Sequence, residues 1–135
     1  MNTTLLALLG FLCWTLLLLV IMETVRSKLV LTREVPANGF NPENSNLSPF
    51  MQRLARAHAN CLEGLPLFGG FMILAVVAGK ANITDPLAYV LLGARIVQST
   101  IHLVSTSSLA VTARFTAFAV QIGIAVYWAV KLFAA

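Results

Sequence analysis

The fold of this 135-residue chain is decided by the stretch Arg53–Phe68, which reads RLARAHANCLEGLPLF. Its strongly polar side chains are spaced three, four and three residues apart, at Arg53, Arg56, Asn60 and Glu63. At about 3.6 residues per turn, this spacing puts all of them on one face of a helix. The chain then stays apolar to Gly79. Because a polar stripe at membrane depth is costly unless it faces other helices or water, we interpret it as a functional site.

The composition places the chain in a membrane. Hydrophobic residues make up 59% of it and charged residues only 10%, against roughly 45–50% and about 25% in soluble domains. A chain this short cannot hide so much apolar surface in a core, so lipid must be the solvent for much of it. In this setting the net charge of +4 is a signal for loop orientation rather than for nucleic-acid binding.

We expect an all-α integral membrane protein, a four-helix bundle in one domain, 1–135. The expected spans are about 4–28, 49–79, 85–104 and 112–133. The first is interpreted as a retained helix, because no basic residue precedes the run Leu5–Met22 and no small-x-small cleavage site follows it. Two helix starts are predicted from a capping residue followed by proline, Ser48-Pro49 and Asp85-Pro86.

The basic residues near the span ends predict the orientation. The first connection and its flanks contain five basic residues, namely Arg26, Lys28, Arg33, Arg53 and Arg56. A sixth, Arg114, lies at the start of the last span on the same side. The opposite side has only two, Lys80 and Lys131. The more basic side is expected in the cytoplasm, with both termini facing away from it. The connection 35–47 is rich in Asn and Pro, and a loop of this length is either mobile or functional.

Three polar groups converge on the cytoplasmic half. The first is the stripe of Arg53–Glu63, the second is Arg95, Gln98 and His102 on one face of the third helix, and the third is the pair of helix ends, Arg26 and Arg114. Glu63 and Arg95 lie at matching depth on antiparallel helices, so an ion pair is predicted; it is either part of a binding site or a structural salt bridge. Bundled arginines with amide and carboxylate partners suit a small, multiply charged anionic ligand.

Metal and disulfide chemistry are not expected. Cys13 and Cys61 are interpreted as free thiols within helices, and His58 and His102 do not have the spacing of a zinc site. His58 lies off the polar stripe and is given a structural role.

The motif Arg56-Ala-His58-x-Asn60-x-x-Glu63-x-x-Pro66-x-Phe68 resembles the second-helix signature of the MAPEG family, the membrane-associated proteins in eicosanoid and glutathione metabolism. The resemblance covers nearly the whole chain. It implies a homotrimer of four-helix subunits, with glutathione bound between neighbouring subunits near the cytoplasmic face.

By this resemblance, Arg56, Asn60 and Glu63 match family contacts to glutathione on the second helix. Arg26 matches a contact at the end of the first helix and Arg95 one on the third. Arg114 matches the fourth-helix arginine that activates the thiol in several members. To these cofactor-binding candidates we add Arg53, Gln98 and His102, which share the polar faces. The chain departs from many members at His102, where they carry tyrosine, and at Gln98, a position that is often histidine.

The leading hypothesis is therefore a membrane-bound glutathione transferase or peroxidase that joins glutathione to, or reduces, a lipophilic substrate arriving from the bilayer. The alternative is a non-catalytic lipid-binding or scaffold protein of the same fold. A transporter is disfavoured, because the outer halves of the second and third spans carry almost no polarity. The expected location is a multi-pass position in a bacterial inner membrane rather than the endoplasmic reticulum, with the site toward the cytoplasm.

Overall fold

A computed structural model describes all 135 residues, and it is entirely helical. Four helices follow one another along the chain: α1 (Thr3–Leu31), α2 (Pro49–Val77), α3 (Ala81–Val104) and α4 (Ser108–Ala134). Each of them is long and apolar enough to cross a membrane. The predicted fold class, an all-α membrane protein with four spans, is confirmed.

Polar side chains cap three of the helices where they begin. Asn2 caps α1 by accepting from the amide of Leu5, and Ser107 caps α4 by accepting from the amide of Ala110. Ser48 caps α2, with Pro49 as the first helical residue, as the sequence predicts. These caps satisfy backbone N–H groups that have no partner inside the helix.

The predicted start of α3 at Asp85 is wrong, because the helix begins at Ala81 and has Pro86 inside it. The Asp85 carboxylate does not cap its own helix. It accepts hydrogen bonds from the amide and hydroxyl of Thr4 at the first turn of α1, at 2.9 and 2.5 Å. The hydroxyls of Thr4 and Thr84 lie 2.6 Å apart beside it, and both threonines are fully buried. Asp85 therefore joins α3 to the first turn of α1 instead of capping its own helix.

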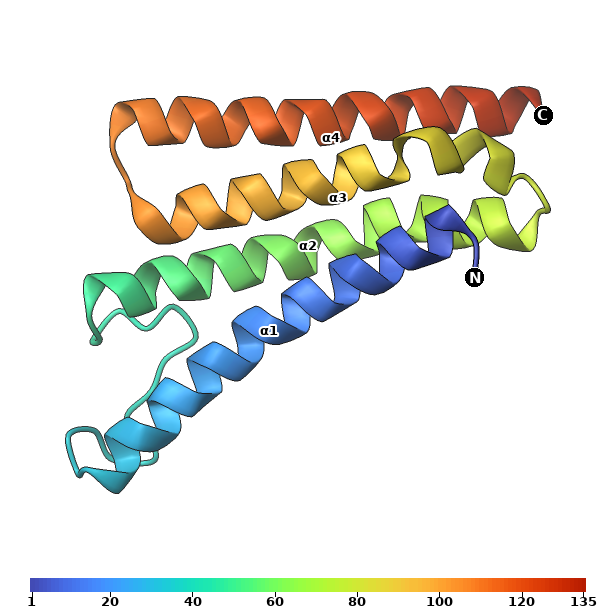
Figure 1. Cartoon of the computed structure of the whole chain (residues 1–135). Helices are drawn as coiled ribbons and strands as arrows, with labels where there is room; N and C mark the ends of the chain where they lie inside the picture. Colours follow the sequence, from blue (N-terminus) through green and yellow to red (C-terminus); the bar gives the residue numbers. More distant parts are fainter.

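The helices lie side by side, with α2 and α3 between α1 and α4 (Figure 1). α3 packs beside all the other helices, whereas the backbones of α1 and α4 are not adjacent. One end of the bundle, here named the loop end, gathers the end of α1, the start of α2, the end of α3 and the start of α4. Both termini and the α2–α3 connection lie at the opposite end.

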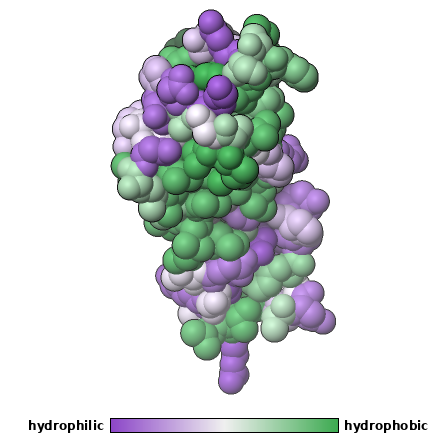
Figure 2. All heavy atoms as spheres, turned by 90° about the vertical axis from the view of Figure 1, so that its right-hand side faces the viewer, coloured by the Kyte–Doolittle hydropathy of each residue, from purple (hydrophilic) through white to green (hydrophobic).

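The bundle buries one apolar core and leaves much apolar surface outside. Its largest buried side chains include Trp128, Phe11, Phe68 and Leu18. Many large hydrophobic side chains on the outer helix faces are exposed, and Figure 2, a view onto the terminal end, shows hydrophobic side chains over much of the surface. Such outer faces suit lipid rather than water as the solvent.

Candidate functional site

A chain of buried and half-buried polar side chains connects α2, α3 and α4 inside the bundle. Asn60 Oδ1 accepts hydrogen bonds from Arg95 Nη1 and from Gln98 Nε2, the latter at 3.2 Å. Gln98 Oε1 accepts in turn from Gln121 Nε2 at 2.9 Å. Arg95 and Gln121 are fully buried, and Gln98 is 4% exposed. The structure thus brings together three of the predicted site residues and adds Gln121, which was not predicted.

Arg95 is a buried cation without a carboxylate partner. Its guanidinium carbon lies 5.4 Å from the ring centroid of Phe11 and 5.6 Å from that of Phe68. These cation–π contacts replace part of the lost hydration. Its Nε and Nη2 atoms are buried and make no hydrogen bond. The site therefore holds positive charge that only Asn60 and two aromatic rings offset.

The predicted ion pair between Glu63 and Arg95 is not formed within the chain. Glu63 is exposed, and the only ion pair in the chain joins Arg26 to Glu23. Gly64 explains the difference, because a Cβ atom there would lie 2.6 Å from Arg95 Nη2. The Arg95 guanidinium occupies the space that a side chain at position 64 would need, whereas Glu63, one residue earlier on the helix, is exposed.

Beside this network a pocket of about 250 Å³ opens between α2, α3 and α4. Four polar side chains line it, namely Asn60, Gln98, His102 and Arg114, together with Val111, Phe115 and Phe118. Both lone-pair positions of Asn60 Oδ1 are used inside the network, so its amide N–H groups are left for the pocket. No carboxylate lines the pocket. Its polar wall is therefore dominated by hydrogen-bond donors and suits an anionic ligand.

A smaller pocket of about 110 Å³ shares Asn60 and Phe118 with the first, and Glu63 and Gly64 also line it. Glu63 therefore lies near the donor-lined pocket, on the same side of α2. A third hollow of about 310 Å³ lies between the long connection and α2, and Arg56 lines it together with Glu43 and Gln52. Arg56 is exposed, so its charge is available to a ligand or a neighbouring subunit.

Arg26 and Arg53 are already engaged within the chain. Arg26 donates from Nε to Asn44 Oδ1 at 3.0 Å, from Nη2 to the Asn41 carbonyl at 3.2 Å and from Nη1 to Glu23 at 3.1 Å. Fully buried Asn44 also donates to the Met51 carbonyl at 2.8 Å. Arg53 donates to the Leu103 carbonyl at 2.8 Å and so ties α2 to the end of α3. Both arginines hold helices and loop together, and their contact with a ligand stays a prediction.

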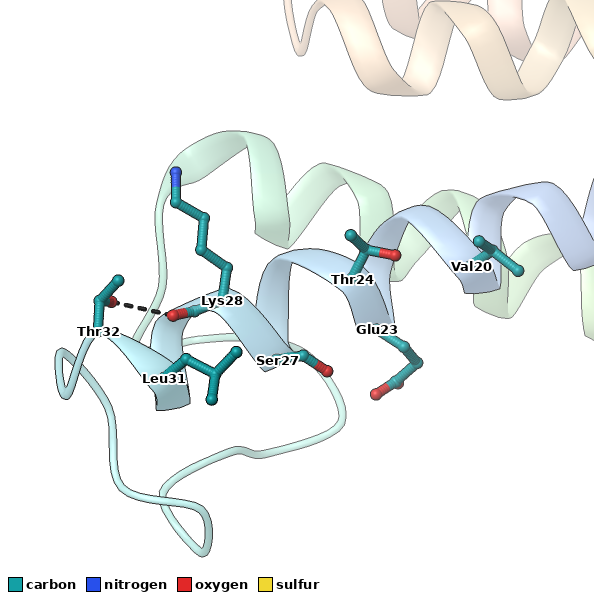
Figure 3. A pocket seen from close by; sticks show the side chains of 7 residues that line it. All are labelled: Val20, Glu23, Thr24, Ser27, Lys28, Leu31 and Thr32. Atoms are coloured by element: carbon teal, nitrogen blue, oxygen red, sulfur yellow. Dashed lines mark hydrogen bonds between the residues drawn. The ribbon is translucent and has the colours of Figure 1, made fainter.

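The largest hollow of the surface is not an enclosed site. It measures about 700 Å³ and is lined only by residues of the C-terminal half of α1 and by Thr32, which caps that helix. Figure 3 shows these side chains along α1 and its end, and no residue of another helix lines the space. We interpret it as an open helix face.

Two residues of these clusters, Gln121 and Asn44, escaped the sequence analysis. Gln121 is the only strongly polar side chain within the apolar run from Ala117 to Val130, and such a residue inside a membrane span is a signal for a functional or packing role. Asn44 gave no comparable signal, because the connection around it is rich in asparagine. Its backbone φ of 55° is one that asparagine tolerates better than most residues.

The comparison with protein families gives one match, in which the model of the MAPEG family covers residues 4–134. Comparisons with curated proteins and with solved structures found no match. The family match spans all four helices and every residue of the polar network. The chain thus belongs to the MAPEG family.

Proposed function

We propose that this protein is a membrane-bound glutathione-dependent enzyme of the transferase or peroxidase type. Family membership makes it a membrane protein of the group that acts in glutathione and eicosanoid metabolism, a group that generally uses glutathione. The observation that carries the proposal is the pocket of Asn60, Gln98, His102 and Arg114, whose polar wall offers donors and no carboxylate. A thiolate or a carboxylate of glutathione is the kind of group that such a wall binds.

The side chains fit the groups of glutathione. Arg114 makes no ion pair and no side-chain hydrogen bond within the chain, so its donors are free for an anionic group. Glu63 beside the pocket suits the ligand's ammonium group, and Arg56 suits a carboxylate. Buried Arg95 adds positive potential behind Asn60. Arg26 and Arg53 contribute charge at the same end of the bundle while their donors hold the loop and α3.

Arg114 is proposed as the catalytic residue. Bound glutathione would supply a sulfur nucleophile, and a cysteine thiol with a pKa near 8.5 is only a few per cent ionised at about pH 7. A guanidinium beside the sulfur favours the thiolate and lowers that pKa. Because α4 begins at Ser108, Arg114 lies in the second turn, where the helix dipole has mostly faded. The stabilisation therefore rests on the guanidinium itself.

The lipophilic substrate is proposed to enter from the bilayer. Val111, Phe115 and Phe118 line the same pocket as Arg114, and Val111 and Phe115 are exposed on the outer face of α4. An apolar electrophile or hydroperoxide dissolved in lipid could reach this side of the pocket without crossing water. The polar wall would hold the thiol, and the aromatic wall would hold its reaction partner.

A homotrimer is proposed because the pocket of one chain is small and open. Its volume of about 250 Å³ lies below the roughly 300–1,000 Å³ of typical ligand pockets, and glutathione needs further walls. The MAPEG family is commonly trimeric, and neighbouring subunits would supply them. Cross-linking in mild detergent should give trimers, whereas a monomer that still binds glutathione would contradict this assembly.

The loop end is proposed to face the cytoplasm, in a bacterial inner membrane rather than the endoplasmic reticulum. It carries five or six basic residues against two at the terminal end. Cysteines introduced at Asn2 and Asn41, in a background in which exposed Cys13 is replaced by serine, should be labelled from opposite sides. Labelling at Asn2 but not at Asn41 from the cytoplasm would reverse the orientation.

The function is tested by calorimetric titration of the detergent-solubilised protein with glutathione, followed by a conjugation assay with a generic aryl halide and a peroxidase assay with a lipid hydroperoxide. We expect binding and turnover in one of the assays. A matched control replaces Lys131, which lies at the opposite end, with alanine and should change neither. Binding without turnover in both assays, or no binding, would favour the alternative, a non-catalytic lipid-binding or scaffold protein. The engagement of Arg26 and Arg53 within the chain is the observation that favours that alternative.

A further inference from the structure

Gln121 is a fully buried amide on α4 whose position is fixed by two acceptors. Its Nε2 donates to the backbone carbonyl of Ala117, one turn earlier, at 3.1 Å, and to Gln98 Oε1 on α3 at 2.9 Å. Its own Oε1 has no partner. Gln121 does not line the donor-lined pocket, but it holds Gln98, which does.

The hydrogen bonds that start at Gln121 can run in only one direction. Gln98 uses Oε1 to accept from Gln121 and Nε2 to donate to Asn60 Oδ1. The Ala117 carbonyl at one end can only accept, and the Arg95 guanidinium at the other can only donate. Turning any one amide over would set oxygen against oxygen or nitrogen against nitrogen, and turning Gln98 over would do both. The two fixed ends therefore determine the orientation of all the amides between them.

This direction decides what the pocket displays. The oxygens of Asn60 and Gln98 are both used inside the network, so N–H groups are left on the pocket side, next to Arg114. We propose that Gln121 is a positioning residue that keeps the pocket wall donor-rich and thereby selects an anionic ligand over a neutral one. That the ligand is glutathione rests on the function proposed above.

Without Gln121, the carbonyl oxygen of Gln98 would be buried and unpaired. A buried acceptor that has lost its donor is costly, so this oxygen would compete for other free donors. Donors on the same pocket wall are the Asn60 amide and the Arg114 guanidinium, which have no hydrogen-bond acceptor within the chain. These donors would then form hydrogen bonds to Gln98 and would no longer be free for the ligand.

The test compares Gln121→Met, which keeps the length of the side chain and removes its polar atoms, with Gln98→Met and the double variant. Glutathione binding to the purified protein should weaken about fivefold in Gln121→Met, as expected for one misplaced hydrogen bond. The double variant should bind no more weakly than Gln98→Met, because Gln121 acts through Gln98. The thiolate absorbance of bound glutathione at neutral pH should fall in Gln121→Met, while S-methylglutathione, which has no ionisable thiol, should lose less affinity.

Two further variants separate positioning from packing. Gln121→His keeps an N–H donor at similar reach and should recover most of the glutathione affinity. Ile124→Met, a change at a buried apolar residue of the same helix, should leave affinity and thiolate absorbance unchanged. If Gln121→Met does not fold, the comparison of Gln121→His with the unaltered protein still decides the question, since a loss with histidine as large as that of Gln98→Met contradicts a role based on the N–H donor.

Three outcomes overturn the inference. Unchanged affinity and absorbance in Gln121→Met would remove Gln121 from the site and leave the proposed function intact. Additive losses in the double variant would show that Gln121 acts independently of Gln98. No binding of glutathione to the unaltered protein would instead refute the proposed function, and this inference with it.

Discussion

Two arginines stand at the loop end of the bundle, Arg26 near the end of α1 and Arg114 near the start of α4. In sequence they look alike, each a single arginine next to a long apolar run. In the structure Arg26 bonds to Asn44, Asn41 and Glu23 and lies 5.5 Å from the ring centroid of Phe40. Arg114 has no such partners and faces a pocket.

The difference shows how the roles of similar residues can be separated. A guanidinium whose donors are satisfied by the chain itself stabilises a fold, and binding a ligand would require it to break those bonds. A guanidinium with free donors beside other free donors can bind an anion at no such cost. On this criterion the cluster around Arg26 holds the long connection, and the cluster around Arg114 is the one that we propose binds a ligand.

The largest effect is expected for Asn60→Leu, because Asn60 both accepts from buried Arg95 and lines the pocket beside Arg114. The change leaves the buried guanidinium of Arg95 without its acceptor, which should lower the free energy of unfolding by about 3 kcal/mol. Thermal unfolding in detergent measures this loss. Adding Arg95→Met should recover most of the stability but not glutathione binding. An Asn60→Leu protein as stable as the parent would contradict the network.

The next largest effect is expected for Asn44→Ala, which tests whether the Arg26 cluster is structural. Arg26 and the Met51 carbonyl lose their partner, and alanine tolerates the backbone φ of 55° less well than asparagine. A loss of about 2 kcal/mol and faster proteolysis within residues 32–48 should follow, with glutathione affinity within about twofold of the parent. Asn44→Gly is the control. Like alanine, glycine removes the side-chain hydrogen bonds, but it adopts the positive φ without strain. A collapse of glutathione binding in a folded Asn44→Ala protein would make the loop part of the site.

Arg114→Ala should leave the fold intact and weaken the thiolate. The expected loss is about one pKa unit of thiolate stabilisation, which corresponds to about 1.4 kcal/mol. Glutathione should still bind, with lower thiolate absorbance and slower turnover. In Arg114→Lys the charge remains but the fixed geometry is lost, so recovery should be partial. Full absorbance and full turnover in Arg114→Ala would exclude this residue from the mechanism and leave His102 as the next candidate.

The smallest effect is expected for Arg26→Lys. Lysine keeps the charge but cannot donate to Asn44 and Glu23 together with the same geometry, and a surface-near cluster of this kind should lose about 0.5 kcal/mol. Glutathione affinity should change by less than about twofold in calorimetry. A tenfold loss of affinity at unchanged stability would instead make Arg26 a ligand contact, as the family resemblance implies, and would end the distinction between the two arginines.

The fold could be predicted from the sequence because its main determinants are local. Long apolar runs predict spans, and the Ser48-Pro49 pair predicts the start of α2 without knowledge of any neighbour. Asp85-Pro86 has the same pattern, and the prediction failed there because a residue 81 positions away uses the carboxylate. A local pattern cannot indicate that a distant partner will compete for the same side chain.

The candidate site was predicted only in part, because helical spacing shows which residues share a face but not how the helices are rotated against each other. Helical spacing put Asn60, Arg95 and Gln98 on faces that can meet, and these residues do meet. The spacing did not distinguish Glu63 from its neighbour Gly64 as the residue that faces Arg95, because this depends on how α2 is rotated against α3. Gln121 could have been noticed as a lone amide in an apolar span, but no pattern within α4 indicates which residue on α3 it contacts.

The contact between Thr4 and Asp85 also has a consequence for biosynthesis. Thr4 is translated 81 residues before Asp85, which at 5–20 residues per second takes roughly 4–16 s. During that interval the first turn of α1 has neither its acceptor nor the hydroxyl of Thr84. The first turn of α1 is therefore synthesised before the groups to which it bonds, and these hydrogen bonds can form only when α3 follows.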